Sequence, residues 1–345
     1  MAGRCAVDQL RHCWGMAITR GFVAAAMSLA AMSAGSIAAA QSPDTSAYPT
    51  RPMRLIVPFP PGGGNDILAR SVGQRLSPII GQQIVVDNRG GAGGVLGATL
   101  AAKAPPDGYT LFLGSLGNLA HNPALKESLP YKPLSDFETV TLLATSSLVL
   151  AVNPRVQADS VSALLALAKA NPGKLNYASA GAGSSLHMTA ELFKHATGAN
   201  LLHVPYKGTG PALTDLVGGR VDLIFSTMPP VLPHLQGGRL HALGVTTAKR
   251  ARSLPDVPTI AESGVAGFDV SNWQGIVTPR HTPVPIVRKL NQALLDTLNA
   301  PGMADALAKQ GLEAAGGTPA QFRALIGAEI ARYTNLVKAT GIRID

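Results

Sequence analysis

Glycine, serine and asparagine residues follow directly after several apolar runs of this sequence. The first run, RLIVPF at 54–59, is followed by PPGGGND. The run YTLFLGS at 109–115 ends at Ser115, and Asn118 follows three residues later. Glycines that precede a helical pattern expose backbone N–H groups, and the N-terminus of a helix adds a partial positive charge. Together these groups bind anions. The chemistry that they indicate is the holding of a small acid or a phosphate.

The same residue types return later in the chain. SAGAGSS at 179–185 and YKGTG at 206–210 each precede a helical pattern, TSS stands at 145–147, and VDLIFST ends at Ser226 and Thr227. Each charge-assisted hydrogen bond contributes about 1.5–3 kcal/mol, so roughly three or four of them hold a carboxylate with micromolar affinity, about −8 kcal/mol. Any one of these segments alone also fits a tight turn or a helix cap. Their recurrence favours a binding site.

A nucleotide site is one alternative. The glycines at 62–64 lack the last glycine of the dinucleotide pattern, since Ile67 stands there, although Asp87 lies where a ribose-binding acid would. The sequence has no GK[ST] phosphate loop and no GxSxG elbow, and its histidines lack the paired spacing of a metal helix. We expect no catalytic residues, no cofactor and no metal. An exported hydrolase or dinucleotide-dependent enzyme is the rival interpretation.

Polar side chains beside these loops fit either a structural role or a contact with a ligand. Asn65 or Asp66 is expected to cap the helix that follows the first loop. His187, three residues after Ser184, fits either a ligand contact or a structural position on a helix, and His203 is expected to face the core.

Composition limits the class of protein. The chain has 345 residues, of which 46% are hydrophobic and 14% charged, so it is long enough for two domains with large cores. The formal net charge of +9 is scattered, without a basic block or interleaved aromatic residues. A nucleic-acid partner is therefore not expected.

Residues 1–40 resemble a secretory leader. Arginines precede GFVAAAMSLAAMSAGSIAAA, an apolar run that ends in small residues. A membrane anchor is the alternative, but the run is short and diluted by alanine, glycine and serine. We expect cleavage near Ala40/Gln41 and export to the periplasm. Because Cys5 and Cys13 fall in the leader, the mature chain is expected to lack cysteine.

Apolar runs alternate with helical patterns from residue 54 onward, which indicates parallel sheets covered on both faces. Strands are expected at 54–59, 83–88, 109–115, 174–180, 201–207, 221–227 and 239–247, and helices at 68–80, 93–104, 160–170, 184–196, 211–219, 285–299 and 319–339. Two adjacent strands are expected within 137–154. The apolar stripe of the last helix consists of Phe322, Leu325, Ile326, Ile330, Tyr333 and Val337.

The alternation restarts after the paired strands, so two α/β domains around a cleft are expected. The predicted first domain comprises 41–145 and 248–345, and the second comprises 146–247. Hinge strands are expected near 142–152 and 242–247. Ligands in such sheets bind at the carboxyl ends of the strands, where the loops described above begin.

Longer blocks of the sequence resemble the receptors of tripartite tricarboxylate transporters, which are the Bug-type solute-binding proteins of bacterial envelopes. These blocks are RLIVPFPPGGGNDILAR, VVDNRGGAGG, AKAPPDGYTLFLG, NPGKLNYASAG, HVPYKGTGPALTDLVGGRVDLIFS and SLPDVPTIAESG. The resemblance implies a two-domain periplasmic-binding-protein-like fold of type II, each domain a mostly parallel sheet flanked by helices. It also implies binding of a small carboxylate-bearing solute and delivery to membrane permease subunits.

The resemblance also implies a set of binding residues. Backbone amides of Phe59–Asp66 would hold a carboxylate, opposite the helix start at Gly181–His187 and the YKG segment at Tyr206–Gly208. This chain has Ser226-Thr227-Met228 where many relatives carry an acidic or amide residue, so a dicarboxylate, tricarboxylate or aromatic acid is expected rather than an amino acid. The expected ligand-binding residues are Phe59, Gly62, Gly63, Gly64, Asp66, Ser115, Asn118, Ser146, Ser147, Gly181, Gly183, Ser184, Ser185, His187, Tyr206, Lys207, Gly208, Ser226 and Thr227.

The sequence therefore predicts a monomeric periplasmic receptor without catalysis. A sensor-coupled binding protein and an exported enzyme remain the alternatives.

Overall fold

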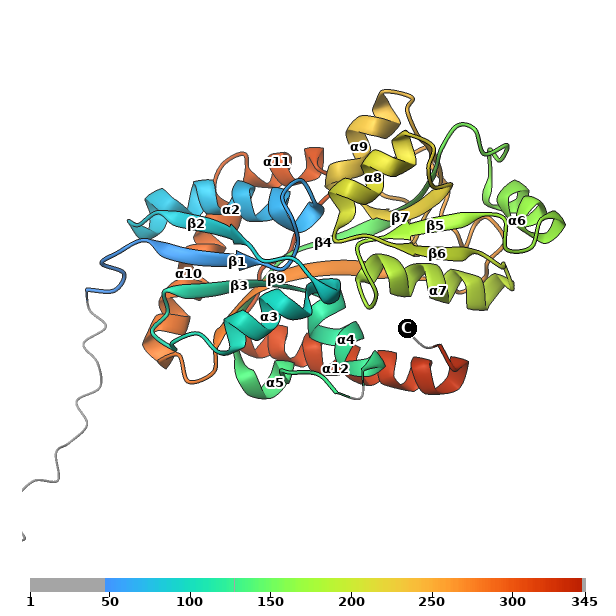
Figure 1. Cartoon of the computed structure of the whole chain (residues 1–345). Helices are drawn as coiled ribbons and strands as arrows, with labels where there is room; N and C mark the ends of the chain where they lie inside the picture. The colour runs from blue at the N-terminus through green and yellow to red at the C-terminus, as the bar shows by residue number, and fades with distance from the viewer. Residues whose placement is uncertain (1–46, 127, 343–345) are drawn as a thin grey trace, which may run out of the picture. The chain divides into compact units, whose positions relative to one another are not determined.

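A ten-stranded sheet with helices on both faces runs through the computed structural model, which describes residues 47–126 and 128–342 (Figure 1). The expected leader lies outside these residues. The strands are β1 (Met53–Val57), β2 (Ile84–Asn88), β3 (Thr110–Ser115), β4 (Phe137–Val152), β5 (Asn176–Ser179), β6 (Leu202–Pro205), β7 (Leu223–Thr227), β8 (His241–Val245), β9 (Ser271–Pro279) and β10 (Glu313–Ala314). The longer helices are α2 (Gly64–Ile80), α3 (Val95–Ala102), α6 (Val161–Ala170), α7 (Ser185–Thr197), α8 (Thr209–Val217), α9 (Met228–Gln236), α10 (Val284–Asn299) and α12 (Pro319–Thr340). The shorter helical segments are η1 (Ala92–Gly94), η2 (Gly117–His121), α4 (Asn122–Leu125), α5 (Pro133–Asp136) and α11 (Met303–Lys309).

The strand order is β2-β1-β3-β9-β4-β7-β5-β6, with β8 and β10 also paired to β4. β1 lies parallel to β2 and β3, and β5 lies parallel to β6 and β7, whereas β4 and β9 run antiparallel to their neighbours. We call β1, β2, β3, β9, β10 and residues 137–147 of β4 the first half of the sheet. The second half is β5 to β8 with residues 148–152 of β4.

β4 is a single strand of 16 residues, so the expectation of two adjacent strands within 137–154 was wrong. It pairs with β9 as far as Ser147 and with β7 and β8 from Leu148 onward. The segment contains no glycine or proline, and its threonines and serines are small enough for a central strand. Register shifts between Thr139 and Thr141 and between Leu142 and Ala144 interrupt the ladder without ending the strand.

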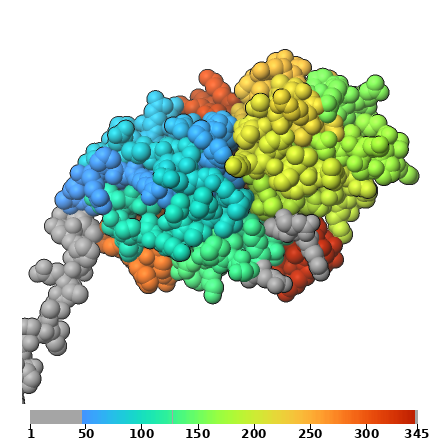
Figure 2. Space-filling model, viewed as in Figure 1, coloured from blue at the N-terminus to red at the C-terminus, as the bar shows by residue number. Residues whose placement is uncertain are grey.

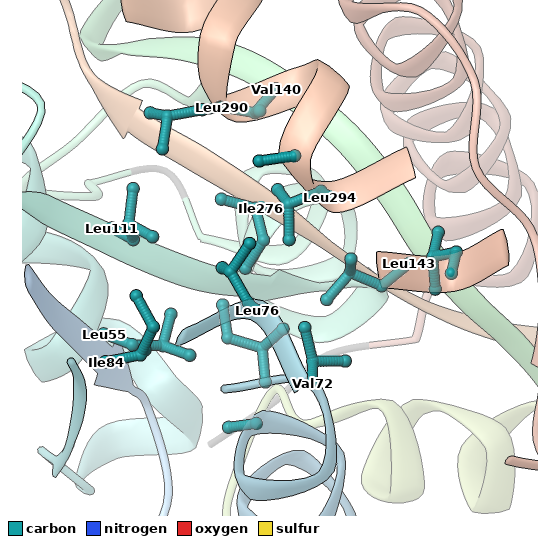
Figure 3. Packing of buried hydrophobic residues seen from close by; sticks show 14 of the residues in the cluster. Leu55, Val72, Leu76, Ile84, Leu111, Val140, Leu143, Ile276, Leu290 and Leu294 are labelled. Carbon is teal, nitrogen blue, oxygen red and sulfur yellow. The ribbon is translucent and has the colours of Figure 1, made fainter. Parts of the chain in front are cut away.

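The helix α2 packs on one face of the first half through an apolar stripe. Leu68, Val72 and Leu76 recur at helical spacing and are buried against the sheet and α10. Figure 3 shows Val72 and Leu76 in one cluster with Leu290 and Leu294 of α10. Each such side chain contributes roughly 1.5–3 kcal/mol when fully buried. This packing holds the N-terminus of α2 at the carboxyl end of β1.

The opposite face of the first half is covered by α3 and α12. The apolar stripe predicted for α12 is confirmed, since Phe322, Ile326 and Tyr333 are buried and the other members pack around them. In the second half, one core cluster contains side chains of α6 and α7, and another contains side chains of α8 and α9. Among the described residues, we find no helix with the length and apolarity needed to cross a bilayer.

Candidate ligand-binding site

A pocket lies where the loops after β1 and β5 meet. The cavity between them has a volume of about 20 Å³, and the lining residues are Phe59, Gly63, Gly64, Asn65, Ala180, Ser184, Ser185, Leu186, Thr209 and Thr227. In Figure 2 the blue segment that follows β1 lies directly against the yellow surface of the second half. The N-termini of α2 and α7 therefore both reach the pocket, as the anion-binding hypothesis requires.

The first loop is built on backbone rather than on a capping side chain. Gly63 is the N-cap of α2 and makes no side-chain hydrogen bond, so the expectation that Asn65 or Asp66 caps this helix was wrong. Instead Asp66, in the first turn, accepts the N–H of Gly62 at 2.9 Å. Gly62 has a φ of +83°, which favours glycine. The carboxylate thus fixes the turn and leaves the N-terminus of the helix open.

Asp66 itself is held by three neighbours. The guanidinium of Arg70 donates to both carboxylate oxygens at 3.0 and 3.1 Å, and Asn88 Nδ2 donates to Oδ1 at 3.0 Å. Asn88 also donates to the carbonyl of Phe59 at 2.9 Å. Burial alone would raise the pKa of Asp66, but the hydrogen bonds from Arg70, Gly62 and Asn88 hold it below 3.8. Asp66 is therefore a charged structural residue of the loop.

The second loop repeats this plan with different side chains. Ser184 is the N-cap of α7, and its hydroxyl accepts the backbone N–H of His187 at 3.3 Å. The ring Nδ1 of His187 accepts the N–H of Gly183 at 3.1 Å, and Gly183 has a φ of +79°. In both loops, a glycine with positive φ stands before the N-cap and donates to the third residue of the helix.

The two halves of the sheet approach each other through glycines. A Cβ atom placed on Gly93 would lie 2.2 Å from the carbonyl oxygen of Ala182, and one on Gly117 would lie 2.9 Å from the backbone nitrogen of Ser185. Contacts this short do not occur for real side chains, and both opposing atoms belong to the backbone. Only glycine fits at these two positions while the loops remain in contact.

Pro60 and Thr227 complete this contact. A Cβ atom on Gly208 would lie 2.7 Å from Cδ of Pro60, and one on Gly64 would lie 2.6 Å from Oγ1 of Thr227. Gly208 was expected to bind ligand, but here it allows the segment before α8 to pack on the first loop. The pocket is thus enclosed from both halves.

Several expected site residues form hydrogen bonds away from the pocket lining. Asn118 Oδ1 accepts the Ser115 N–H at 3.0 Å, and its Nδ2 donates to Ser115 Oγ at 2.9 Å, so the pair holds the turn after β3. Ser147 Oγ bonds Thr247 Oγ1, and Ser226 Oγ donates to the carbonyl of Thr227 at 3.0 Å.

The remaining expected residues lie in β4, in the segment before α8 and in the loop after β5. Ser146 is buried in β4 and its hydroxyl has no hydrogen-bond partner within the described part of the chain. The Tyr206 hydroxyl donates to Asp215 at 2.8 Å, and Lys207 is exposed. The Gly181 N–H donates to Ser179 Oγ at 3.1 Å. Six of the nineteen expected residues line the pocket, namely Phe59, Gly63, Gly64, Ser184, Ser185 and Thr227.

Sequence reasoning missed Asn65, Ala180, Leu186 and Thr209 as lining residues. Asn65 Nδ2 and Thr227 Oγ1 are buried and have no hydrogen-bond partner among the residues that the structure describes. Because both residues line the pocket, these atoms can bind a polar ligand. The signal for Asn65 was its position at the start of α2, which was interpreted only as a possible cap.

His203 packs against the core on one side, since its ring stacks on that of the buried Tyr177 with centroids 4.9 Å apart. It is half-buried on β6, stacks on His187, and its Nε2 lies 2.7 Å from Ser179 Oγ. This serine–histidine pair does not present a nucleophile, because Ser179 is completely buried and its hydroxyl accepts the Gly181 N–H. The ring of His187 is likewise directed at the Gly183 N–H rather than at the Ser184 hydroxyl.

Asp87 is not free to bind a ribose. Arg54 Nε donates to its Oδ2 at 2.6 Å, and Arg89 Nε lies 2.9 Å from its Oδ1. Burial would raise its pKa, but these arginines hold the pKa below the usual value for aspartate. The residue that kept the dinucleotide interpretation open is thus occupied by structural ion pairs.

Comparison with known proteins is consistent with this geometry. The family model for the tripartite tricarboxylate transporter family receptor matches residues 68–342. The protein BugT of Bordetella pertussis is 42% identical over 309 residues, covering 89% of this chain and 94% of BugT.

Solved structures of similar sequence have the same fold. An R. palustris protein solved with adipate is 40% identical, with a TM-score of 0.83 over 86% of this chain and 99% of that one. MatC from Rhodopseudomonas palustris, solved with bound malate, is 34% identical, with a TM-score of 0.81 over 84% of this chain and 100% of that one.

Proposed function

The chain belongs to the tripartite tricarboxylate transporter receptor family, and from this premise we propose that its pocket captures a small dicarboxylate for a membrane permease. The protein is a carboxylate-binding solute receptor with a two-domain periplasmic-binding-protein-like fold. The choice of a dicarboxylate, the binding residues and the permease are the parts that we infer.

One observation carries the proposal, which is that two helix N-termini reach one pocket whose lining includes two residues with buried polar atoms that have no partner in the described part of the chain. The first turns of α2 and α7 each bring N–H groups to the lining, at Gly64 and Asn65 and at Ser185. Asn65 Nδ2 and Thr227 Oγ1 add donors that have no partner among the described residues. A carboxylate gains charge-assisted hydrogen bonds from such donors, each contributing about 1.5–3 kcal/mol.

The lining also supports an acid without an amino group. It contains no aspartate or glutamate side chain, and the nearby Asp66 is already paired with Arg70. An ammonium group in this pocket would therefore lack a counter-ion and would keep its desolvation cost. Relatives solved with adipate and malate support a linear dicarboxylate as the class of ligand.

The geometry supports binding without catalysis. The Ser184 hydroxyl is bonded to a backbone N–H, and the His187 ring accepts another backbone N–H. Among the lining residues no side chain pairs a nucleophile with a base.

A ligand screen tests the proposal directly. We expect adipate or malate to raise the thermal midpoint, whereas glutamate does not, and at 100 times its Kd a ligand adds about 2.7 kcal/mol to the stability. The variant that should lose this ligand effect is Gly63→Val. Its Cβ atom would lie 3.7 Å from the carbonyl oxygen of Pro60 and 3.9 Å from Thr209 Cβ, so we expect the variant to fold and its side chain to fill part of the pocket and abolish the shift. If no dicarboxylate stabilises the parent, the proposal of a dicarboxylate ligand is wrong.

We further propose that residues 1–40 are removed and that the mature receptor acts in the periplasm. Periplasmic relatives and the composition of the leader support this. N-terminal sequencing of the exported protein should find a start at or near Gln41, and an intact leader would contradict it.

The proposed hinge lies near 142–152 and 242–247, between domain 1 at 41–145 and 248–345 and domain 2 at 146–247. The support for it is that β4 changes partners after Ser147 and that Thr246 Oγ1 accepts the N–H of Leu148 at 2.9 Å there.

A further inference from the structure

The second loop rests on two stacked imidazole rings. His187 and His203 lie with ring centroids 4.0 Å apart and planes within 7°. His187 Nδ1 accepts the Gly183 N–H, and His203 Nε2 contacts the Ser179 hydroxyl that accepts the Gly181 N–H. Neither ring lines the pocket. Each ring instead determines, directly or through a serine, where a glycine amide of the loop lies.

We propose that His187 is a positioning residue of the binding site, which holds Gly183 with a neutral acceptor and thereby aims the first N–H groups of α7 at the bound acid. These N–H groups belong to Ser185 and Leu186, which both line the pocket. Gly183 has a φ of +79°, and because glycine adopts many backbone conformations freely, an external hydrogen bond is needed to hold it in this one. The inference deepens the proposed function and rests on it for the identity of the ligand.

The acceptor must be uncharged because no cation of the described residues pairs with it as Arg70 pairs with Asp66 in the first loop. The titratable groups that face His187 are Glu191 and Lys194 on its own helix, Tyr177 on β5, His203 on β6 and His121 on η2. Glu191 is bonded to Lys194 and Tyr177.

Burial is the main reason why the pKa of His187 falls to about 4, and the neighbouring His203 and Lys194 lower it further while Glu191 opposes them. The ring is therefore neutral at pH 7 and keeps the lone pair that Gly183 requires. A carboxylate at this position would also accept the N–H of Gly183. It would, however, place a negative charge close to the carboxylate of the bound ligand.

Three variants separate the acceptor from its charge. His187→Gln keeps a neutral acceptor, as glutamine does at the third position of a capping box. His187→Leu removes the acceptor, and His187→Glu makes it charged. With adipate as the probe in calorimetry at pH 7.5, we expect His187→Gln to bind within about threefold of the parent, and the other two to bind about tenfold more weakly. Parent-like binding by His187→Leu, or equal losses in His187→Gln and His187→Leu, would overturn the inference.

The ligand-free protein provides a second measurement that is independent of the substrate. Between pH 7 and pH 3 the NMR resonance of the Gly183 amide should titrate in the parent, because protonation of Nδ1 removes the acceptor. In His187→Gln most of this shift should be lost, and only the smaller effect of neighbours such as His203 and Glu191 should remain. A Gly183 resonance that does not move in the parent contradicts the inference. If Gly183 titrates but adipate does not bind the parent, the substrate class is wrong and the positioning role stands.

Discussion

Replacing Gly117 by alanine should weaken the binding of adipate by about 10- to 100-fold while the protein remains folded. The new Cβ atom would lie 2.9 Å from the backbone nitrogen of Ser185, so the turn after β3 and the second loop must separate. Forcing an extra methyl group into a packed contact costs about 1–3 kcal/mol, and about 1.4 kcal/mol corresponds to tenfold in affinity. Calorimetry measures the affinity, and small-angle scattering with ligand should show a less compact state than the parent reaches.

The control for this prediction is Gly327→Ala in α12. Gly327 is also helical, but its Cβ atom would lie 3.8 Å from Leu134 Cδ1, which is an ordinary contact. Alanine is favoured over glycine in a helix by about 1 kcal/mol, so both variants gain local helix stability and only one loses affinity. Equal affinities for the two variants would show that contact between the halves is not needed for binding.

Replacing Asp66 by alanine should lower the free energy of unfolding by about 2–3 kcal/mol, because it removes a buried carboxylate that accepts four hydrogen bonds from Gly62, Arg70 and Asn88. Urea unfolding at pH 7.5 measures this loss. Arg70→Ala should cost less, about 1 kcal/mol or below, because the Arg70 side chain is 55% exposed and that of Asp66 only 5%. A larger loss for Arg70→Ala would contradict this account of the loop.

The pH dependence of the same site has a definite sign. The pKa of Asp66 is lowered in the folded protein, so the ionised carboxylate stabilises the fold at every pH above the unfolded value of 3.8. The stability difference between the parent and Asp66→Asn should therefore be constant from pH 7 to pH 5. It should shrink as the pH falls through the folded pKa of Asp66.

The elements with strong periodicity could be predicted from the sequence. β1 and α2 follow from a continuous apolar run and from Leu68, Val72 and Leu76 at helical spacing. The long strand β4 could not be divided correctly, because an apolar run interrupted by small hydroxyl residues is compatible with one strand or with two. Its length is set by β9 on one part and by β7 and β8 on the other, which are distant in sequence.

The location of the pocket could be predicted, but the roles of many of its residues could not. Glycine loops before helices mark the carboxyl end of a sheet, and the loops after β1 and β5 do line the pocket. The structural role of Asp66 could not be predicted, because its partner Asn88 lies 22 residues away and no local pattern links them. In the same way, Gly117 meets Ser185 only after the two halves of the sheet pack together.

The continuity of β4 through both halves of the sheet affects how receptors with this fold can acquire new ligand specificities. A recombination event between Ser147 and Leu148 would join two parents inside one strand, so residues 137–147 from one parent would have to pair with β9 from the other. A poor match in this central pairing would expose strand edges, and exposed edges pair with other chains. The loops at 59–66 and 181–185 can change without altering the strand pairing. Inherited diversity in ligand preference should therefore accumulate by substitution within loops rather than by the shuffling of halves.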